Sequence, residues 1–468
     1  MRRRTFLEAG LAGACSSAAS AGVVQVPSAP LPDEMTRGWA AGADRSRLAG
    51  IAISIVRTGQ PDIFWSHGYA ELPFRTPITR QTLFPIGSTS KHVTAIGVLR
   101  LTEAGVIGLD DPITRHLKDA PATWAPITIR HLLTHTSGLA NNWDFFPDFD
   151  RPHPRSELIK RIGAEPLAFP PGSAWAYTSL NYDILGWVIG DLAGMPFAAF
   201  MQNRVFDPAG LPHARIDAAD EIIPMRAEGY NVEDDRIHHS AREAHDLSAS
   251  GAGGVLFSGA DIPPWDRALA SNTLISKQST QASLSPVMLS TGRAFPYGFG
   301  WYFGQTRGNV FHWHGGSEPG YIAQYVCYPS LGLSVFSAIN SFIYSDMDPA
   351  IEAIRVQVAE HFSPGSTWLS LPDGPPAEGR RGAVLRRMLS GQILDPEALA
   401  PEAQKRKAYE HNSFGQTLKS PLVSLNEVER YGYQGVTAIR YRAVTASSTS
   451  HFVAGWTPDD RLVWVSAV

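Results

Sequence analysis

The chain has 468 residues and a net charge of −4, with 44% hydrophobic and 18% charged residues. This composition is typical of a globular protein with a large core and a smaller second domain, and the charge gives no reason to expect a nucleic-acid partner. No apolar run is long enough to cross a bilayer, so we expect no transmembrane span.

Residues 1–30 are predicted to be a signal peptide with a short linker. The run Arg2-Arg3-Arg4-Thr5-Phe6-Leu7 resembles the twin-arginine export signal of bacteria, and small and apolar residues follow it. Ala19-Ser20-Ala21 is a suitable cleavage site. We therefore expect an exported protein, periplasmic or secreted, and a disordered basic start is the alternative.

The two cysteines give no disulfide in the mature chain. Cys15 lies in the predicted signal, which leaves Cys327 alone. The residues before Cys15 partly resemble a lipoprotein box, although Ala12 stands where a larger aliphatic residue is usual. Lipid anchoring at Cys15 is therefore the lesser alternative to cleavage.

Residues 31–363 are expected to form one α+β domain, in which an antiparallel sheet is flanked by helices and carries an all-α insertion. The expected elements are, in chain order, strands at 51–56 and 63–69, an apolar helix from Ser88 to about Gly105, helices with Pro-rich loops over 115–250, a hairpin of 321–328 and 333–339, and a helix at 348–362. Within the helical region, apolar residues recur at every fourth position from Leu180 to Leu192.

The C-terminal part is predicted to be a second, small α+β domain. A Pro/Gly-rich linker at 364–382 precedes it, and residues 383–468 form the domain. Its expected elements are helices at 383–389 and 396–410 and strands at 422–428, 436–444, 451–456 and 462–465. It weakly resembles cystatin-like or nuclear-transport-factor-like modules, and it could cover a cleft, form a dimer or add solubility.

The sequence Ser88-Thr89-Ser90-Lys91 starts the apolar helix and is the main candidate for chemistry. Residues three apart on a helix share a face, which puts the Lys91 amine within reach of the Ser88 hydroxyl. A dry site lowers a lysine pKa, and the neutral amine can then take the serine proton. In the alternative interpretation, Ser88 caps the helix and Lys91 is a solvated charge in its first turn.

A serine–lysine pair needs a group that passes a proton to the leaving group and donors for the oxyanion. Two segments could supply them. Tyr177-Thr178-Ser179 precedes the helix that contains Leu180, and His314-Gly315-Gly316-Ser317 precedes the hairpin. The two glycines let backbone N–H groups approach a ligand closely.

Together these motifs resemble the serine β-lactamase-related family, which includes class C β-lactamases, DD-peptidases, D-aminopeptidases and family VIII-type esterases. The resemblance covers about residues 35–360 and implies a β-lactamase/transpeptidase-like fold. The motifs that carry it are, in order, Leu83 to Lys91, Leu109-Asp110-Asp111-Pro112, His131 to Leu139, Pro171-Gly172 with Tyr177, Gly253-Gly254, Tyr297 to Trp301, and the His314 segment.

The resemblance implies a role for each matching residue. Ser88 would be the acylated nucleophile, Lys91 its base and Tyr177 the proton carrier to the leaving group. His314 falls where the family has lysine or histidine. The backbone N–H groups of Ser88 and Ser317 would form the oxyanion hole, and Ser179, Gly315 and Gly316 would contact the substrate. No metal or organic cofactor is expected.

Two departures from the family pattern bear on the substrate. Ser179 stands where a Tyr-x-Asn motif has a carboxamide, and His314 replaces the lysine of strong β-lactamases. A histidine is mostly neutral near pH 7 and anchors a carboxylate weakly. Both changes favour an esterase or a peptidase acting on D-residues over efficient β-lactam hydrolysis.

Other interpretations of the same residues stay open. His312 with His314, or His131 with His135, could be metal ligands, but neither pair has the carboxylate expected beside it. Tyr177 could be a core residue and Ser179 a helix cap. The expected function is an exported serine hydrolase that takes a small-molecule or short-peptide substrate and could form homo-oligomers. The alternative is a penicillin-binding or sensing module that is acylated without turnover.

Overall fold

The computed structural model describes residues 30–140, 153–233, 236–240, 249–343, 349–372, 374–404, 420–433, 436–447 and 449–467. The predicted signal peptide, with Cys15, lies outside the described residues apart from its last position.

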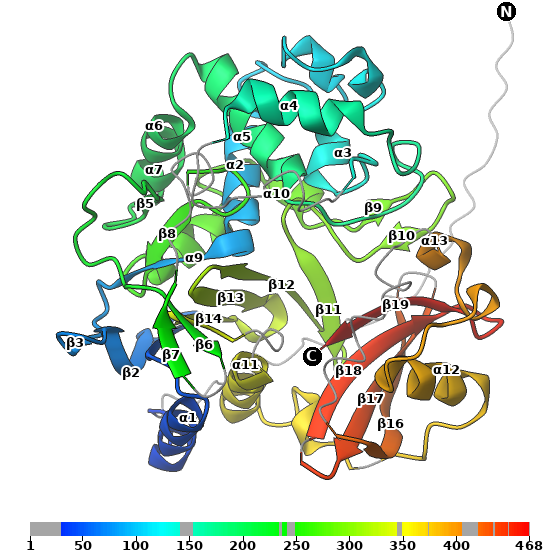
Figure 1. The fold of residues 1–468 in the computed structure, drawn as a ribbon. Coiled ribbons are helices and arrows are strands. Elements are labelled where there is room, and N and C mark those ends of the chain that lie inside the picture. The colour runs from blue at the N-terminus through cyan, green and yellow to red at the C-terminus, as the bar shows by residue number, and fades with distance from the viewer. Residues whose placement is uncertain are drawn as a thin grey trace, which may run out of the picture.

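A seven-stranded antiparallel sheet forms the centre of the molecule (Figure 1). Its strands are, in spatial order, β11 (Tyr302–Thr306), β12 (Asn309–Glu318), β13 (Tyr321–Tyr328), β14 (Leu333–Ile339), β1 (Gly50–Arg57), β2 (Ile63–Glu71) and β3 (Thr76–Pro77). The predicted strands at 51–56 and 63–69 and the predicted hairpin are confirmed. The N-terminal strands join the hairpin because β1 pairs with β14.

Helices cover both faces of this sheet. On one face, α1 (Asp33–Arg45) and α11 (Pro349–Phe362) pack on the isoleucines of β1. On the other face, α2 (Ser90–Glu103) and α9 (Ile262–Ala270) pack in a larger cluster that includes Ala52 and Ala338. Successive strand residues point to opposite faces, so β1 is buried along its whole length.

The helical insertion is shorter than predicted. It contains α3 (Ile129–Leu133), α4 (Arg155–Ala164), α5 (Leu180–Ala193), α6 (Phe197–Met201) and α7 (Asp207–Ala209). Among the described residues, no single helix is long and apolar enough to span a bilayer.

Beyond Ala209, the prediction of helix up to residue 250 is wrong for residues 210–233 and 236–240, and residues 241–248 lie outside the described residues. Gly210 adopts a left-handed conformation (φ +70°) that ends the helix, and short strands follow. These are β5 (Arg215–Ile216), β6 (Tyr230–Glu233) and β7 (Arg236–His239). β5 pairs with β8 (Val255–Ser258), which also pairs with β4 (Leu83–Pro85), and β6 pairs with β15 (Ser341–Ile343). Such short strands form because of distant partners, which a local sequence pattern does not reveal. The remaining elements are α10 (Lys277–Ser283), β9 (Val287–Met288) and β10 (Ala294–Phe295).

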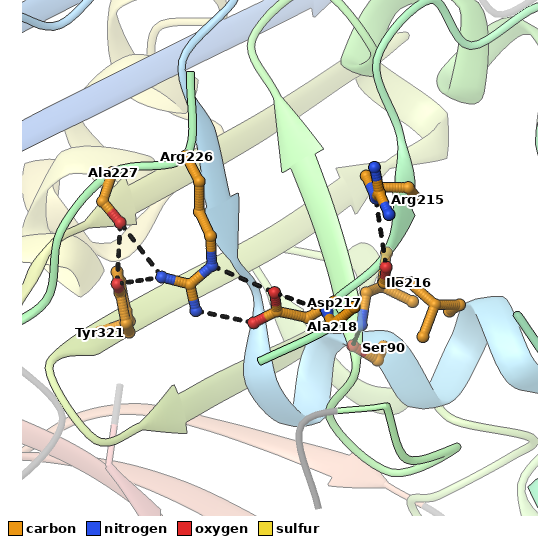
Figure 2. A network of polar contacts seen from close by, with 9 residues as sticks. Ser90, Arg215, Ile216, Asp217, Ala218, Arg226, Ala227 and Tyr321 are labelled. Carbon is orange, nitrogen blue, oxygen red and sulfur yellow. Dashed lines mark hydrogen bonds and ion pairs between the residues drawn. The ribbon is translucent and has the colours of Figure 1, made fainter. Parts of the chain in front are cut away.

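A buried ion pair connects the segments next to these short strands with the central sheet (Figure 2). The Arg226 guanidinium donates to both carboxylate oxygens of Asp217, at 3.1 and 2.6 Å, and to the Tyr321 hydroxyl at 2.7 Å. Tyr321 in turn donates to the Ala227 carbonyl. Since Tyr321 is the first residue of β13, this network fixes the turn that follows β12.

The C-terminal residues form a four-stranded antiparallel sheet with one long helix packed on it. The sheet lies beside β11 in Figure 1. Its elements are α12 (Gly379–Leu389), α13 (Pro401–Gln404), β16 (Leu422–Tyr433), β17 (Val436–Thr445), β18 (Thr449–Trp456) and β19 (Leu462–Ala467). The four predicted strands are confirmed. The segment predicted as a helix at 396–410 is instead a short turn at Pro396–Ala398 followed by α13, and the rest lies outside the described residues.

The predicted linker at 364–382 is partly regular structure. It contains a turn at Trp368–Ser370, and α12 begins at Gly379, within the predicted linker. The Ala377 amide donates to the Leu425 carbonyl of β16, so the end of the segment extends the C-terminal sheet.

A buried arginine joins the two sheets, and its loss should be costly. Arg440 on β17 is 1% exposed, pairs with Glu429 at 3.3 Å and donates to the Gln305 carbonyl of β11. Arg440→Gln should lower the free energy of unfolding by about 3 kcal/mol, because the Glu429 carboxylate loses its charged partner and keeps the Arg307 amide while it stays largely shielded from water.

The matched control is Arg430→Gln, which breaks a pair with Glu427 on the same sheet but at a side chain that is 54% exposed. Its effect should stay within about 0.5 kcal/mol. Denaturant unfolding measures the free energy of unfolding of both variants. Equal losses would contradict the role of Arg440 as a buried link between the two sheets.

Candidate active site

Ser88 lies in a tight turn between β4 and α2. The turn, Gly87–Thr89, is a 3-10 helix that continues directly into α2. Gly87 has φ +49°, and a Cβ there would lie 2.8 Å from the Ser317 amide nitrogen. Only glycine therefore allows β12 to approach the turn at this point.

Lys91 follows one turn later and is fully buried. Its Nζ lies 2.8 Å from Ser88 Oγ, 3.3 Å from Ser179 Oγ and 3.1 Å from the Ala252 carbonyl oxygen. The helix α2 is buried nearly all round, and the Lys91 side chain is 0% exposed. The interpretation of Lys91 as a solvated charge is therefore wrong.

Burial also changes the chemistry of the amine. Desolvation lowers the pKa of Lys91 to about 8, although the carboxylates of Asp183 and Glu318 oppose this shift. Burial likewise raises the pKa of Asp183 to about 6. A substantial fraction of Lys91 is thus neutral in mildly alkaline solution and able to accept a proton.

Tyr177 is the second group beside the nucleophile. Burial raises the pKa of its hydroxyl above the ordinary value, and hydrogen bonds with Ser88 and Ser179 oppose the shift. Tyr177 is therefore protonated near neutral pH, and its ring lies 5.0 Å from Lys91 Nζ. Of these two groups, Lys91 is the one that can act as a base at that pH.

A chain of hydrogen bonds holds His314 in one tautomer. Ser137 donates to the Asn181 oxygen, and the Asn181 amide donates to His135 Nδ1 at 3.0 Å. The other nitrogen of His135 must then carry the hydrogen, which it donates to the Tyr297 hydroxyl at 3.2 Å.

Tyr297 in turn donates to His314 Nε2 at 3.1 Å, and His314 Nδ1–H donates to the Gly315 carbonyl. Burial lowers the pKa of His314 to about 3, so its ring is neutral. We assign these tautomers because they are the ones that give every hydrogen bond in this series one donor and one acceptor. His314 cannot offer a positive charge to a substrate near neutral pH.

The edge of β12 runs alongside the Ser88 turn. β11 pairs with β12 only over residues 309–313, whereas residues 312–318 pair with β13 on the opposite side. A Cβ on Gly316 would lie 2.0 Å from the Ile86 carbonyl oxygen and 2.7 Å from the Ser88 amide nitrogen. The backbone amides of Ser88 and Ser317 therefore lie in the same small region.

These groups border a cavity of about 390 Å³. The residues predicted from the sequence that line it are Ser88, Tyr177, His314, Gly315, Gly316 and Ser317. Lys91 and Ser179 lie just behind this lining, where the Lys91 amine is within hydrogen-bond distance of both Ser88 Oγ and Ser179 Oγ. The fold thus brings together every site residue that the sequence predicted.

Sequence reasoning missed Asp183 and Asn181 as parts of this site. It quoted Tyr297 only as part of a family motif, and it considered His135 only as a possible metal ligand. Asp183 follows Ser179 by four residues, so it shares its face of α5, and this spacing was a usable signal. No sequence signal links His135 to Tyr297, because 162 positions separate them.

The histidine pairs considered as metal ligands have other surroundings. His131 forms a capping box with Thr128 at the start of α3, and His312 lies against the Trp301 ring. Within the described part of the chain, no group of three histidine, cysteine or acidic residues is arranged to hold a metal ion.

The comparison with known families agrees with the sequence resemblance. A family model described as Beta-lactamase matches residues 35–359. The chain belongs to the beta-lactamase family. It is accordingly a serine hydrolase of that family, with the β-lactamase/transpeptidase-like fold.

Relatives in this family differ in their activities. Penicillin-binding protein 4* of Bacillus subtilis (strain 168) is 30% identical over 357 residues, which are 71% of this chain and 77% of that protein. Esterase EstB of Burkholderia gladioli is 35% identical over 186 residues, which are 35% of this chain and 46% of that protein.

A solved structure extends the likeness to the C-terminal sheet. The octameric penicillin-binding protein homologue from Pyrococcus abyssi superposes with a TM-score of 0.62 and 19% identity, and the match covers 92% of this chain and 94% of that one. At this identity the likeness concerns the fold alone.

The pKa of Lys91 predicts the pH dependence of acylation. Only the neutral amine accepts the serine proton, so kcat/KM for an ester should rise with pH and level off above about 8. Asp183→Asn removes a carboxylate that raises the pKa of Lys91, so this limb should move to lower pH.

The control is Asp191→Asn on the same helix, where Asp191 pairs with Arg155 near the surface. Its pH profile should match that of the wild type. An unchanged profile in Asp183→Asn would show that Lys91 is not the titrating base.

Gly316→Ala should disable the site. The added methyl group would collide with the Ile86 carbonyl and move β12 away from the Ser88 turn, so we expect kcat/KM to fall by about 10²–10³, as for the loss of an oxyanion donor. The control Gly38→Ala, in α1, places its methyl group where no atom lies within 4 Å. Wild-type activity in Gly316→Ala would contradict the close approach of β12 to the Ser88 turn.

Proposed function

We propose that the protein is an exported serine hydrolase that cleaves esters or amide bonds through an acyl-enzyme. One observation carries the proposal: a fully buried lysine amine lies 2.8 Å from Ser88 Oγ and has a pKa lowered to about 8. A buried lysine costs stability, and its position beside a hydroxyl that it can deprotonate supports a catalytic role.

In the acylation step, Ser88 Oγ attacks the substrate carbonyl carbon while neutral Lys91 takes the hydroxyl proton. The backbone N–H groups of Ser88 and Ser317 donate to the developing oxyanion. The bond from the carbonyl carbon to the leaving oxygen or nitrogen then breaks, and Tyr177 donates its proton to that atom while it regains one from Lys91. In deacylation, a water molecule attacks the acyl carbon and gives a proton to Lys91. The bond from that carbon to Ser88 Oγ then breaks, Lys91 returns the proton to Ser88 Oγ, and the carboxylic acid leaves.

The substrate is proposed to be an ester or a D-amino-acid derivative, in preference to a β-lactam. The neutral ring of His314 gives no cation for the carboxylate that β-lactams and D-Ala-D-Ala peptides carry. The hydroxyl of Ser179, which lies 3.3 Å from Lys91 Nζ, replaces an amide-binding carboxamide. Esterase EstB among the relatives is consistent with this choice.

Export through residues 1–30 and assembly into homo-oligomers are part of the same proposal. The export signal rests on the twin-arginine-like sequence, and the octameric homologue from Pyrococcus abyssi supports assembly.

The test combines active-site labelling with turnover. A fluorophosphonate probe should label the wild-type protein at Ser88, and short-chain esters, D-amino-acid amides, D-Ala-D-Ala peptides and nitrocefin should be compared as substrates. Ser88→Ala should lose labelling and turnover, while Ser90→Ala, two residues away, serves as a control for the helix. Rapid ester turnover supports the hydrolase, stable labelling by a fluorescent penicillin without product release supports the sensing module, and no reaction with any reagent refutes both.

A further inference from the structure

The active-site cavity has a wall that the C-terminal sheet provides. Trp464 and Val465 of β19 line the same cavity as Ser88, Tyr177 and His314. β19 is nearly 380 positions from Ser88 in the sequence, so no motif pointed to it. The C-terminal sheet therefore forms part of the wall of the active-site cavity.

This wall is held in place by a continuous apolar cluster. Trp175, Phe295 and Tyr297 from the catalytic region pack with Val436, Val453, Val463 and Trp464 from the C-terminal sheet. The Arg440 contact with Gln305 anchors the same sheet to β11. The β11–β12 hairpin also contributes Tyr302 and Trp313 to the cavity, so the hairpin and β19 together form one continuous wall.

The position of the Trp464 ring depends on Gly455. The two residues are paired across β18 and β19, and a Cβ on Gly455 would lie 2.4 Å from the indole ring. The ring thus lies flat over the glycine, and Trp464 is only 9% exposed. A large ring held in this way is a fixed surface rather than a mobile cover.

The chemistry of the wall is apolar and uncharged. Aromatic rings make up most of it, and among the described residues that line the cavity none has an ionised side chain, because His314 is neutral. Lys91 does not line the cavity, because its amine lies behind Ser88 and donates to Ser88 Oγ. A substrate carboxylate placed here would lose its hydration without gaining a partner.

We propose that Trp464 is a specificity-determining residue, and that the C-terminal sheet completes a pocket for an uncharged aromatic or aliphatic group of the substrate. This inference rests on the proposed function and narrows it to esters or amides with a hydrophobic group and no carboxylate near the scissile bond.

The test compares substrates that differ only in the group offered to the pocket. Proton release measures kcat/KM for methyl acetate, methyl phenylacetate and benzyl acetate, so that the aryl group is placed on either side of the ester. The wild type should prefer at least one aryl ester to methyl acetate. In Trp464→Ala this preference should fall by about tenfold or more, and Trp464→Phe should retain most of it.

Val436→Ala is the matched control, because Val436 belongs to the same cluster but does not line the cavity. It removes two methyl groups from the cluster but leaves the Trp464 ring in the cavity wall, so the preference should change much less than in Trp464→Ala. Equal losses in both variants, or none in Trp464→Ala, would overturn the role of Trp464.

A charged substrate tests the second half of the proposal. Monomethyl succinate and methyl butyrate are close in size, and the carboxylate should make the former about 100-fold poorer. A preference for monomethyl succinate would overturn the uncharged pocket.

Binding separates this inference from the proposed function. Calorimetry with methyl phenylacetate and the Ser88→Ala protein needs no turnover, and binding should be lost in the Ser88→Ala/Trp464→Ala double variant. If the wild type turns over no ester and no amide but this binding difference holds, the proposed function fails and the pocket stands. If esters are turned over with a preference that is independent of Trp464, only the pocket fails.

Discussion

The burial of one amine constrains the whole site. Lys91 is a cation by default, and placing it at the head of a helix that is buried nearly all round requires partners for every proton it carries. Ser88, Ser179 and the Ala252 carbonyl provide them from three separate segments. The same lack of water lowers the pKa of the amine, so the burial that costs stability also suits Lys91 to the proposed role of base.

The surroundings of Lys91 explain why the other polar groups divide into distinct roles. Asp183 opposes the loss of charge on the amine, whereas burial keeps Tyr177 protonated and His314 neutral. Titratable groups with separated pKa values can act as base and acid at the same pH. The chain from Ser137 to Gly315 then fixes the ring of His314, which borders the cavity as a neutral group.

The parts that sequence reasoning predicted well have strong local patterns. The strands β1 and β2, the hairpin β13–β14 and the helix α2 each carry an apolar run of the right length and composition. The order of several motifs identified Ser88, Lys91, Tyr177 and His314 together. The short strands from β5 to β7 were missed because two to four residues carry no periodicity, and their partners lie far along the chain. The contacts of Tyr297 with His135 and His314 were missed for a related reason, since they form only in the folded chain, whereas the spacing of Asp183 from Ser179 was a signal that was not used.

By itself, the sequence determined the family, the main strands of the central sheet and the residue types of the proposed reacting groups. Each of these can be recognised from a short contiguous stretch of the sequence. Only the tertiary structure decided that Lys91 is buried, that burial keeps His314 neutral while Tyr297 fixes its tautomer, and that Trp464 lines the same cavity as Ser88. The physical reason is that burial, tautomer and cavity shape are properties of what surrounds a residue. Those neighbours come from segments that are distant in sequence and meet only in the folded chain.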